Sequence, residues 1–197
     1  MSSDAPEIKP GDYPECSQFV DEPGVTLIDA RTKARALARA RSLVATFECS
    51  TGLPHEDEVE RYVRRRAVPQ VLEHGHRGCE LLLFRDASGV LMAVAQHEET
   101  ALFLREPERS SLIVVVALRR DLRRACLRGR KTRLAAFVME QVLERSRQAG
   151  RGSIVGGIVS RQNMGSLKLC ERMHLDEPID IPDDPDYVYM VGLFERA

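Results

Sequence analysis

The chain has 197 residues, of which 43% are hydrophobic, so it is long enough to enclose one globular core of ordinary size. A formal net charge of −1 excludes attraction of nucleic acid by the field of the whole molecule, and any such role would need a local cluster. The five cysteines are scattered and show no C-x-x-C pair, which predicts reduced thiols in a cytoplasmic protein.

The first 75 residues predict a leader followed by a strand and two helices. Residues 1–24 hold several prolines and acids but few large apolar side chains, so an extended or disordered leader is expected there, with a single domain over 25–197. Residues 25–29 predict a strand, and 30–48 predict a helix with one apolar and one basic face. A second helix is expected over 55–75, with a kink at Pro69.

The middle of the chain predicts strands. Residues 79–86 and 90–99 are apolar runs on either side of a short turn that contains glycine, which is typical of a hairpin. Residues 111–118, "SLIVVVAL", are apolar at consecutive positions, as in a strand buried on both faces, and they are expected at the centre of the sheet. This run is too short to cross a membrane, which takes about 20 apolar residues.

Residues 127–150, "LRGRKTRLAAFVMEQVLERSRQAG", predict a helix with cations crowded at its start, namely Arg128, Arg130, Lys131 and Arg133. A helix N-terminus already carries partial positive charge, so each exposed cation in the first turn is unfavourable by roughly 0.3–1 kcal/mol. The crowding therefore favours a negatively charged ligand at this point. A solvated basic face on an amphipathic helix is the alternative.

The last third predicts a strand over 152–160, a short helix over 163–173 and a final strand over 186–196. The predicted class is α/β (α+β), with a mixed, mostly antiparallel central sheet flanked by helices. A ligand site is expected beyond the carboxyl end of the central strand, where it leads into the basic helix.

At the basic helix the chain resembles the GNAT superfamily of N-acetyltransferases, which transfer an acyl group from coenzyme A. That family marks this loop with Gln/Arg-x-x-Gly-x-Gly/Ala, and Arg130 and Ala135 fit the pattern, whereas Arg133 stands where glycine is usual. Backbone N–H groups there hold the diphosphate of acetyl-CoA. The resemblance implies cofactor contacts from the loop and helix start, at Arg130, Lys131, Thr132, Arg133, Leu134 and Ala135.

Two further segments carry the resemblance. Residues 160–175, "SRQNMGSLKLCERMHL", resemble the family's helix that begins at asparagine, which implies that Asn163 and Ser166 contact the pantetheine arm; Asn163 is also a good N-cap in its own right. By the same resemblance the central strand opens a β-bulge, so that backbone N–H groups of Val116, Ala117 and Leu118 face the cofactor.

The resemblance leaves the acid and base of catalysis open. Cys170 replaces the tyrosine that protonates the departing thiolate in many family members, and it is either that acid or an inert buried thiol. Glu98 and Glu99 end the hairpin strand and are candidate bases or an exposed strand end. Tyr189 with Tyr187, and His97, are further candidates that core or sheet packing would also explain. The histidines show no ligand spacing, and no metal is expected.

The expected function is transfer of acetyl from acetyl-CoA to an amine acceptor by direct attack. One alternative is a nucleic-acid-binding module that uses the eight cations within residues 119–133, and an acetyltransferase acting on an RNA-linked amine would combine the two. Another is a CoA-binding GNAT fold without turnover. The acceptor is not readable from the sequence, which also leaves open whether the chain forms a homodimer; no membrane role is expected.

Overall fold

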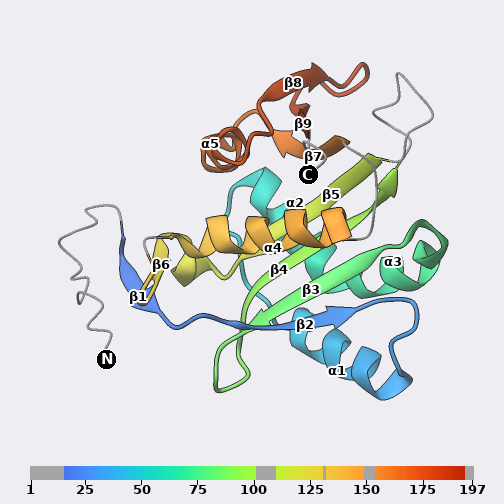
Figure 1. Ribbon diagram of the computed structural model, residues 1–197, viewed down its shortest axis with the longest axis vertical. Helices are drawn as coiled ribbons and strands as arrows, with labels where there is room; N and C mark the ends of the chain where they lie inside the picture. Colours follow the sequence, from blue (N-terminus) through green and yellow to red (C-terminus); the bar gives the residue numbers. More distant parts are fainter. Residues whose placement is uncertain (1–15, 101–109, 131, 149–153, 194–197) are drawn as a thin grey trace.

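The structure is a computed structural model, which describes residues 16–100, 110–130, 132–148 and 154–193. Within these residues the main sheet has seven strands (Figure 1). In spatial order they are β2 (Gly24–Ile28), β3 (Glu80–Arg85), β4 (Leu91–Thr100), β5 (Ser110–Leu118), β7 (Ile154–Ser160), β9 (Tyr187–Leu193) and β8 (Glu177–Asp180). Only the β5–β7 pair among them is parallel. The predicted mixed, mostly antiparallel sheet is confirmed.

Helices cover both faces of this sheet (Figure 1). The first three helices pack on one face, and the last two pack on the other. Their bounds are α1 (Ala34–Ala45), α2 (Pro54–Arg65), α3 (Ala67–Glu73), α4 (Leu134–Gln148) and α5 (Met164–Arg172), with single 3₁₀ turns at Gly75–Arg77 and Arg120–Leu122. No helix in the described part of the chain is long and apolar enough to span a bilayer.

The expected helix over 55–75 is two helices, and the expected kink at Pro69 is wrong. The break falls at Arg66, where φ is −114°, between α2 and α3. Pro69 is then the third residue of α3, in the first turn, where a missing N–H removes no intrahelical hydrogen bond.

The central position of β5 is confirmed, since it is the fourth of the seven strands. Its side chains pack into the apolar cores on both faces of the sheet. Ile113 packs with α4 and α5, whereas Val115 and Ala117 pack with α1, α2 and α3. Burial on both faces explains why this strand is apolar at consecutive positions.

The start of the basic helix differs from the prediction. The helix α4 begins at Leu134, and residues 125–127 form a short strand, β6 (Ala125–Leu127). A turn follows in which Gly129 has φ of +75°, a conformation that glycine adopts without cost. The arginines at 128, 130 and 133 therefore precede the helix and do not lie in its first turn.

The expectation of an extended or disordered leader does not hold for residues 16–24, and the expectation of reduced thiols is wrong for Cys16 and Cys126. The strand β1 (Gln18–Val20) pairs in parallel with β6, and a disulfide joins Cys16 to Cys126. Cys49, Cys79 and Cys170 are free and buried. Folded structure thus begins before residue 25, and residues 1–15 lie outside the described part of the chain.

Candidate functional site

The central strand parts from its parallel neighbour halfway along its length. The strands β5 and β7 pair only from Ser110 with Ile154 to Ile113 with Gly157, although β5 continues to Leu118 and β7 to Ser160. Beyond Ile113 the side of β5 that faces away from β4 therefore has no strand beside it. A backbone edge in the middle of a sheet exposes N–H and C=O groups that a ligand can bind.

A bulge in β5 lies at the start of this open edge. Gln96 of β4 faces Val115 while the next residue, His97, faces Ile113, so Val114 is the extra residue. The bulge is present, but it lies before the 116–118 segment in which the resemblance implied it.

The hydrogen-bond ladder determines which groups of β5 face the opening. The N–H of Arg119, directly after β5, donates to the carbonyl of Met92 in β4 at 2.8 Å, which continues the pairing of the two strands. Because backbone groups of a strand alternate in direction, the N–H groups of Leu118 and Val116 point away from β4, and that of Ala117 points toward it. Two of the three expected contacts thus present their backbone to the opening.

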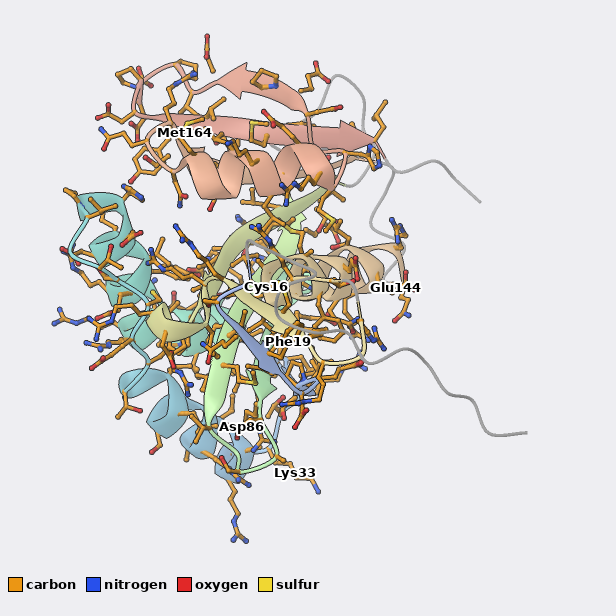
Figure 2. All side chains as sticks on the ribbon, turned by 90° about the vertical axis from the view of Figure 1, so that its left-hand side faces the viewer. Cys16, Phe19, Lys33, Asp86, Glu144 and Met164 are labelled. Atoms are coloured by element: carbon orange, nitrogen blue, oxygen red, sulfur yellow. A yellow bond between two sulfur atoms is a disulfide. The ribbon has the colours of Figure 1, made fainter. Side chains whose placement is uncertain are left out.

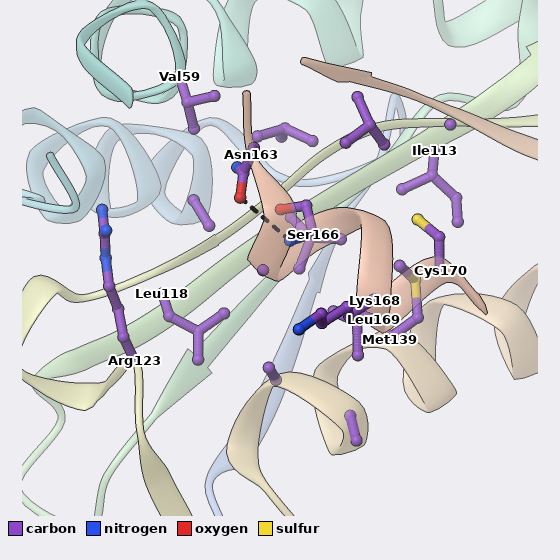
Figure 3. A pocket seen from close by; sticks show the side chains of 18 of the residues that line it. Val59, Ile113, Leu118, Arg123, Met139, Asn163, Ser166, Lys168, Leu169 and Cys170 are labelled. Atoms are coloured by element: carbon purple, nitrogen blue, oxygen red, sulfur yellow. Dashed lines mark hydrogen bonds between the residues drawn. The ribbon is translucent and has the colours of Figure 1, made fainter. Parts of the chain in front are cut away.

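A cleft of about 1030 Å³ follows this edge, between β5 and β7 and between α4, α5 and α2 (Figure 3). Ten of the residues expected at the site line it: Val116, Ala117, Leu118, Arg130, Thr132, Arg133, Ala135, Asn163, Ser166 and Cys170. Leu134 does not line the cleft, because its side chain is fully buried in the core under α4, and Lys131 lies outside the described residues. The volume is at the upper end of the range for small-molecule sites.

Asn163 caps α5 at the mouth of the cleft. Its Oδ1 accepts a hydrogen bond from the N–H of Ser166 at 3.1 Å (Figure 3). The N-cap interpretation is confirmed, and the amide nitrogen of the same side chain is the group that stays available as a donor to a ligand.

Cys170 lies deep in the cleft, near Ile113 and Met139 (Figure 3). The side chain is 3% exposed, and burial raises the pKa of its thiol to about 11. At neutral pH this residue is a protonated thiol, which can donate a proton but is a poor nucleophile.

Three of the expected catalytic residues lie elsewhere. Glu98 faces Leu112 in the closed part of the sheet, and its Oε2 lies 2.7 Å from Nδ1 of His74; Glu99 faces Ser111 in the same closed part. Tyr189 packs against the small cluster around Leu112. None of the three lines the cleft: Glu98 and Glu99 lie on β4, which β5 separates from the opening, and Tyr189 lies on β9, on the far side of β7. The expected catalytic roles do not fit these positions.

Of the two remaining candidates, Tyr187 lines the cleft and His97 does not. His97 is fully buried, with Nε2 3.2 Å from Oε2 of Glu80, and lies outside the cleft. Tyr187 lines the cleft and donates a hydrogen bond to Glu58 of α2. This hydrogen bond and burial raise the pKa of Tyr187 to about 12.

The helix α2 contributes a wall of the cleft that was not expected from the sequence. His55, Glu58, Val59 and Tyr62 line the cleft at spacings of three and four, which place them on one face of the helix. The sequence predicted a helix here, but no pattern in it shows that one face of this helix borders an opening.

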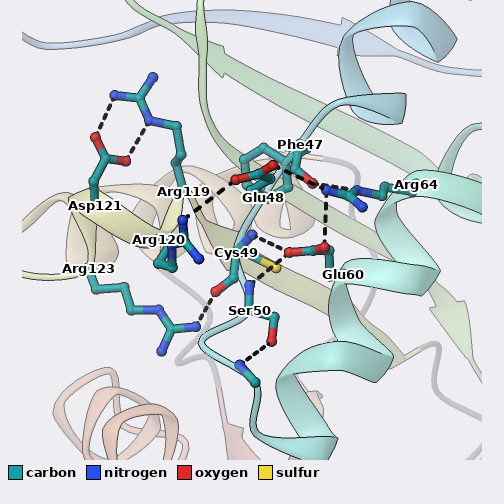
Figure 4. A network of polar contacts seen from close by, with 11 residues as sticks. Phe47, Glu48, Cys49, Ser50, Glu60, Arg64, Arg119, Arg120, Asp121 and Arg123 are labelled. Atoms are coloured by element: carbon teal, nitrogen blue, oxygen red, sulfur yellow. Dashed lines mark hydrogen bonds and ion pairs between the residues drawn. The ribbon is translucent and has the colours of Figure 1, made fainter.

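The cleft is lined by cationic side chains from α5 as well as from the loop before α4. Lys168 and Arg172, one helical turn apart on α5, join Arg123, Arg130 and Arg133. Arg123 donates hydrogen bonds to the carboxylate of Glu56 and to the carbonyl of Cys49, the latter shown in Figure 4. Burial acts to raise the pKa of Glu56, but hydrogen bonds from Arg123 and Thr51 outweigh it and lower this pKa to about 2.

Much of the basic cluster at 119–133 is paired within the chain (Figure 4). Arg119 contacts Asp121 at 2.7 Å, and Arg120 contacts Glu48 at 3.7 Å. Arg128 and Arg130 contact Asp21 and Glu22. These pairs leave a smaller positive surface than the sequence suggested. No group of three or more residues suited to a metal ion occurs in the described part of the chain.

Comparisons of the sequence with protein-family models and with curated proteins give no match. Solved structures do match. A histone acetyltransferase HPA2 and related acetyltransferase from Corynebacterium glutamicum has a TM-score of 0.55 at 13% identity, covering 89% of this chain and 98% of that one. A chain of the NatC complex bound to Gag peptide and CoA has 0.53 at 14%, covering 88% and 99%.

A third structure carries the family name. A protein assigned to the GNAT family of acetyltransferases, from Desulfovibrio desulfuricans, has a TM-score of 0.53 at 14% identity and covers 87% of this chain and 99% of that one. Identities this low establish the fold alone. The described chain therefore has the GNAT fold, as the resemblance of its sequence implied.

Proposed function

We propose that the chain is a CoA-dependent N-acyltransferase that transfers acetyl from acetyl-CoA to an amine. The observation that carries this proposal is the open edge of β5, where the N–H groups of Val116 and Leu118 face a cleft that leads to the cationic loop before α4. An extended amide-containing arm can bind along such an edge as an added strand would.

The anionic end of the cofactor is proposed to bind at residues 130–135. Arg130 and Arg133 line the cleft there, and the first N–H groups of α4 have no intrahelical acceptor. Arg133 occupies a position where glycine is usual, so we assign it a guanidinium contact with phosphate in place of close backbone approach. Asn163 and Ser166 line the same cleft from α5.

The chemistry requires attack of the amine nitrogen on the thioester carbon, loss of a proton from that nitrogen to water in the cleft, and breakage of the carbon–sulfur bond. The N–H groups of β5 polarise the thioester carbonyl. Cys170 is the proton donor to the leaving thiolate that the cleft offers, because its thiol remains protonated with a pKa of about 11. Glu58 and Tyr187 border the opening from which the amine approaches.

Isothermal titration with acetyl-CoA and a thiol-release assay with pooled amines test the proposal. We expect binding, and we expect Arg133→Glu or Arg130→Glu to weaken it at least about tenfold, since each replaces attraction of a phosphate by repulsion. Arg39→Glu, an exposed residue of α1 away from the cleft, makes the same charge change and should leave the affinity unchanged.

Three results would count against the proposal. Absence of binding at millimolar acetyl-CoA would refute the cofactor assignment. Unchanged affinity in both loop variants would return those arginines to a solvated basic surface. Binding without thiol release from any amine would mean a CoA-binding fold without turnover.

A further inference from the structure

The N-terminal strap, which we define as residues 16–22, runs beside the loop that leads into α4 (Figures 1 and 2). The N–H of Ser17 donates to the carbonyl of Arg124 at 3.0 Å, and the N–H of Arg128 donates to the carbonyl of Val20 at 2.7 Å. The disulfide from Cys16 to Cys126 fixes the first residue of the strap. Cys16 and Cys126 both line the cleft, so the strap forms part of its rim.

The strap ends in two acids that contact the cations of the loop. Oδ1 of Asp21 lies 2.9 Å from Nε of Arg128, and Oε2 of Glu22 lies 2.6 Å from the guanidinium of Arg130. The latter guanidinium also lies 5.7 Å from the ring centre of Phe137 in α4. Asp21 and Glu22, about a hundred residues earlier in the chain, therefore neutralise part of the positive charge of this loop.

A carboxylate and a phosphate compete for the same guanidinium. Arg130 lines the cleft and is paired with Glu22, whose side chain is 46% exposed and can move away without breaking a core contact. An exposed pair of this kind is weak, so a phosphate can displace it at a modest loss of affinity. The strap must stay in place for the competition to persist, and the disulfide with the β1–β6 pairing keeps it there.

We propose that the strap is a built-in competitor for the anionic end of the cofactor and that the Cys16–Cys126 disulfide determines how strongly it competes. This inference rests on the proposed function, because it concerns the same phosphate site. Reduction by a dithiol transfers two electrons and two protons to the disulfide, which yields two cysteine thiols while the dithiol closes to its own disulfide. The β1–β6 pairing and β2, which begins at Gly24, still hold the strap, but without the crosslink its acids have a lower effective concentration at the loop.

The test is the dissociation constant of acetyl-CoA by isothermal titration, for oxidised and dithiol-reduced protein. Reduction should tighten binding by about two- to tenfold, the range expected for one or two exposed ion pairs. Cys16→Ser should bind like the reduced protein. The double variant Asp21→Asn/Glu22→Gln should bind as tightly whether oxidised or reduced, because its strap carries no competing charge.

A matched control removes two exposed acids on the far edge of the sheet. Glu177→Gln/Asp183→Asn makes the same change in net charge and should keep both the wild-type affinity and the response to reduction. Mass spectrometry of the oxidised protein under non-reducing conditions should find Cys16 linked to Cys126.

Each contrary result has one meaning. Equal affinity of oxidised and reduced wild-type protein refutes the competitor, as does an equal gain on reduction in the Asp21→Asn/Glu22→Gln variant. Absence of the Cys16–Cys126 link in oxidised protein refutes the switch. If no variant binds acetyl-CoA in either state, the proposed function is refuted and the strap proposal with it, whereas binding that never responds refutes the strap proposal alone.

Discussion

His174 holds a backbone conformation that ordinary side chains rarely adopt. Its φ is +60°, directly after α5, where the N–H of Leu175 donates to the carbonyl of Cys170 at 2.9 Å. Helices commonly end in this way with glycine at the left-handed position. His174 takes this conformation despite the steric cost that its β-carbon brings.

Substitution of His174 by glycine should therefore stabilise the protein. We expect His174→Gly to raise the free energy of unfolding by about 1 kcal/mol, because it removes the clash of a β-carbon in the left-handed region. His174→Ala keeps that β-carbon and should give no such gain. Urea denaturation of the three proteins measures the difference, and a loss of stability in the glycine variant would contradict the explanation.

The free cysteines of the cleft wall should be chemically quiet. Burial, followed by the charge of Glu60, raises the pKa of Cys49 to about 12, and burial raises that of Cys170 to about 11. Since the thiolate is the reactive form, iodoacetamide at pH 8 should alkylate neither residue in the folded protein and both in urea. Peptide mass spectrometry reads the sites. Rapid alkylation of folded protein at Cys170 would contradict its role as a protonated donor.

At the scale of elements, a group of charged side chains around the partly buried Glu80 ties α4 to the sheet. Glu80 of β3 accepts hydrogen bonds from Arg145 of α4 at 3.0 Å, and its carboxylate lies 3.2 Å from His97 of β4. Ser146 of α4 and Ser111 of β5 continue the polar contacts, with their hydroxyl oxygens 2.9 Å apart. This group orients the helix whose first turn borders the cleft.

The group should make stability depend on pH. Burial acts to raise the pKa of Glu80, but hydrogen bonds from His97 and Arg145 outweigh it and lower this pKa from 4.5 to about 2. A carboxyl with a lowered folded pKa stabilises above its unfolded value, and this contribution is lost as the pH falls from about 4.5 through 2.

We therefore expect acid to destabilise the wild-type protein more than Glu80→Gln, by on the order of 2–3 kcal/mol over this range. Glu144→Gln, an exposed acid on the same helix, should follow the wild type. Thermal unfolding across the pH range measures the effect. Parallel pH profiles for wild type and Glu80→Gln would show that Glu80 does not titrate as described.

Elements with strong periodicity were predictable from the sequence, and short ones were not. The hairpin of β3 and β4, the central β5 and the capped α5 were all expected, because each carries its own apolar pattern or cap. The strands β1 and β6 have three residues each and lie about a hundred residues apart. Their pairing and the disulfide beside it depend on tertiary contacts that no local pattern reports.

The same limit applies to the site. The loop residues and the cap of α5 were expected because they match short motifs, and most of them line the cleft. Glu98 and Glu99 were expected from their place at the end of a strand, but the register puts that end in the closed half of the sheet. Register depends on the neighbouring strand, and a pattern within one strand does not determine it.

At the scale of the whole molecule, the GNAT fold accounts for why one sheet holds such a cleft. A parallel pair in an otherwise antiparallel sheet parts after four residue pairs, and the helices on either face close the sides of the opening. Most of the cations that suggested nucleic-acid binding are paired with acids of the chain. These acids lie in α2, in the strap and, at Glu48, in the loop between α1 and α2. These pairs reduce the positive charge that this surface presents to a long polyanion.

A crystal structure with acetyl-CoA would show whether the cleft beside β5 is the cofactor site. We predict the thioester in the cleft beside the bulge at Val114, the pantetheine arm bonded to the backbone of Val116 and Leu118, and the diphosphate within reach of residues 130–135. Acetyl-CoA bound outside this cleft, or no bound ligand in crystals soaked at saturating concentration, would contradict it.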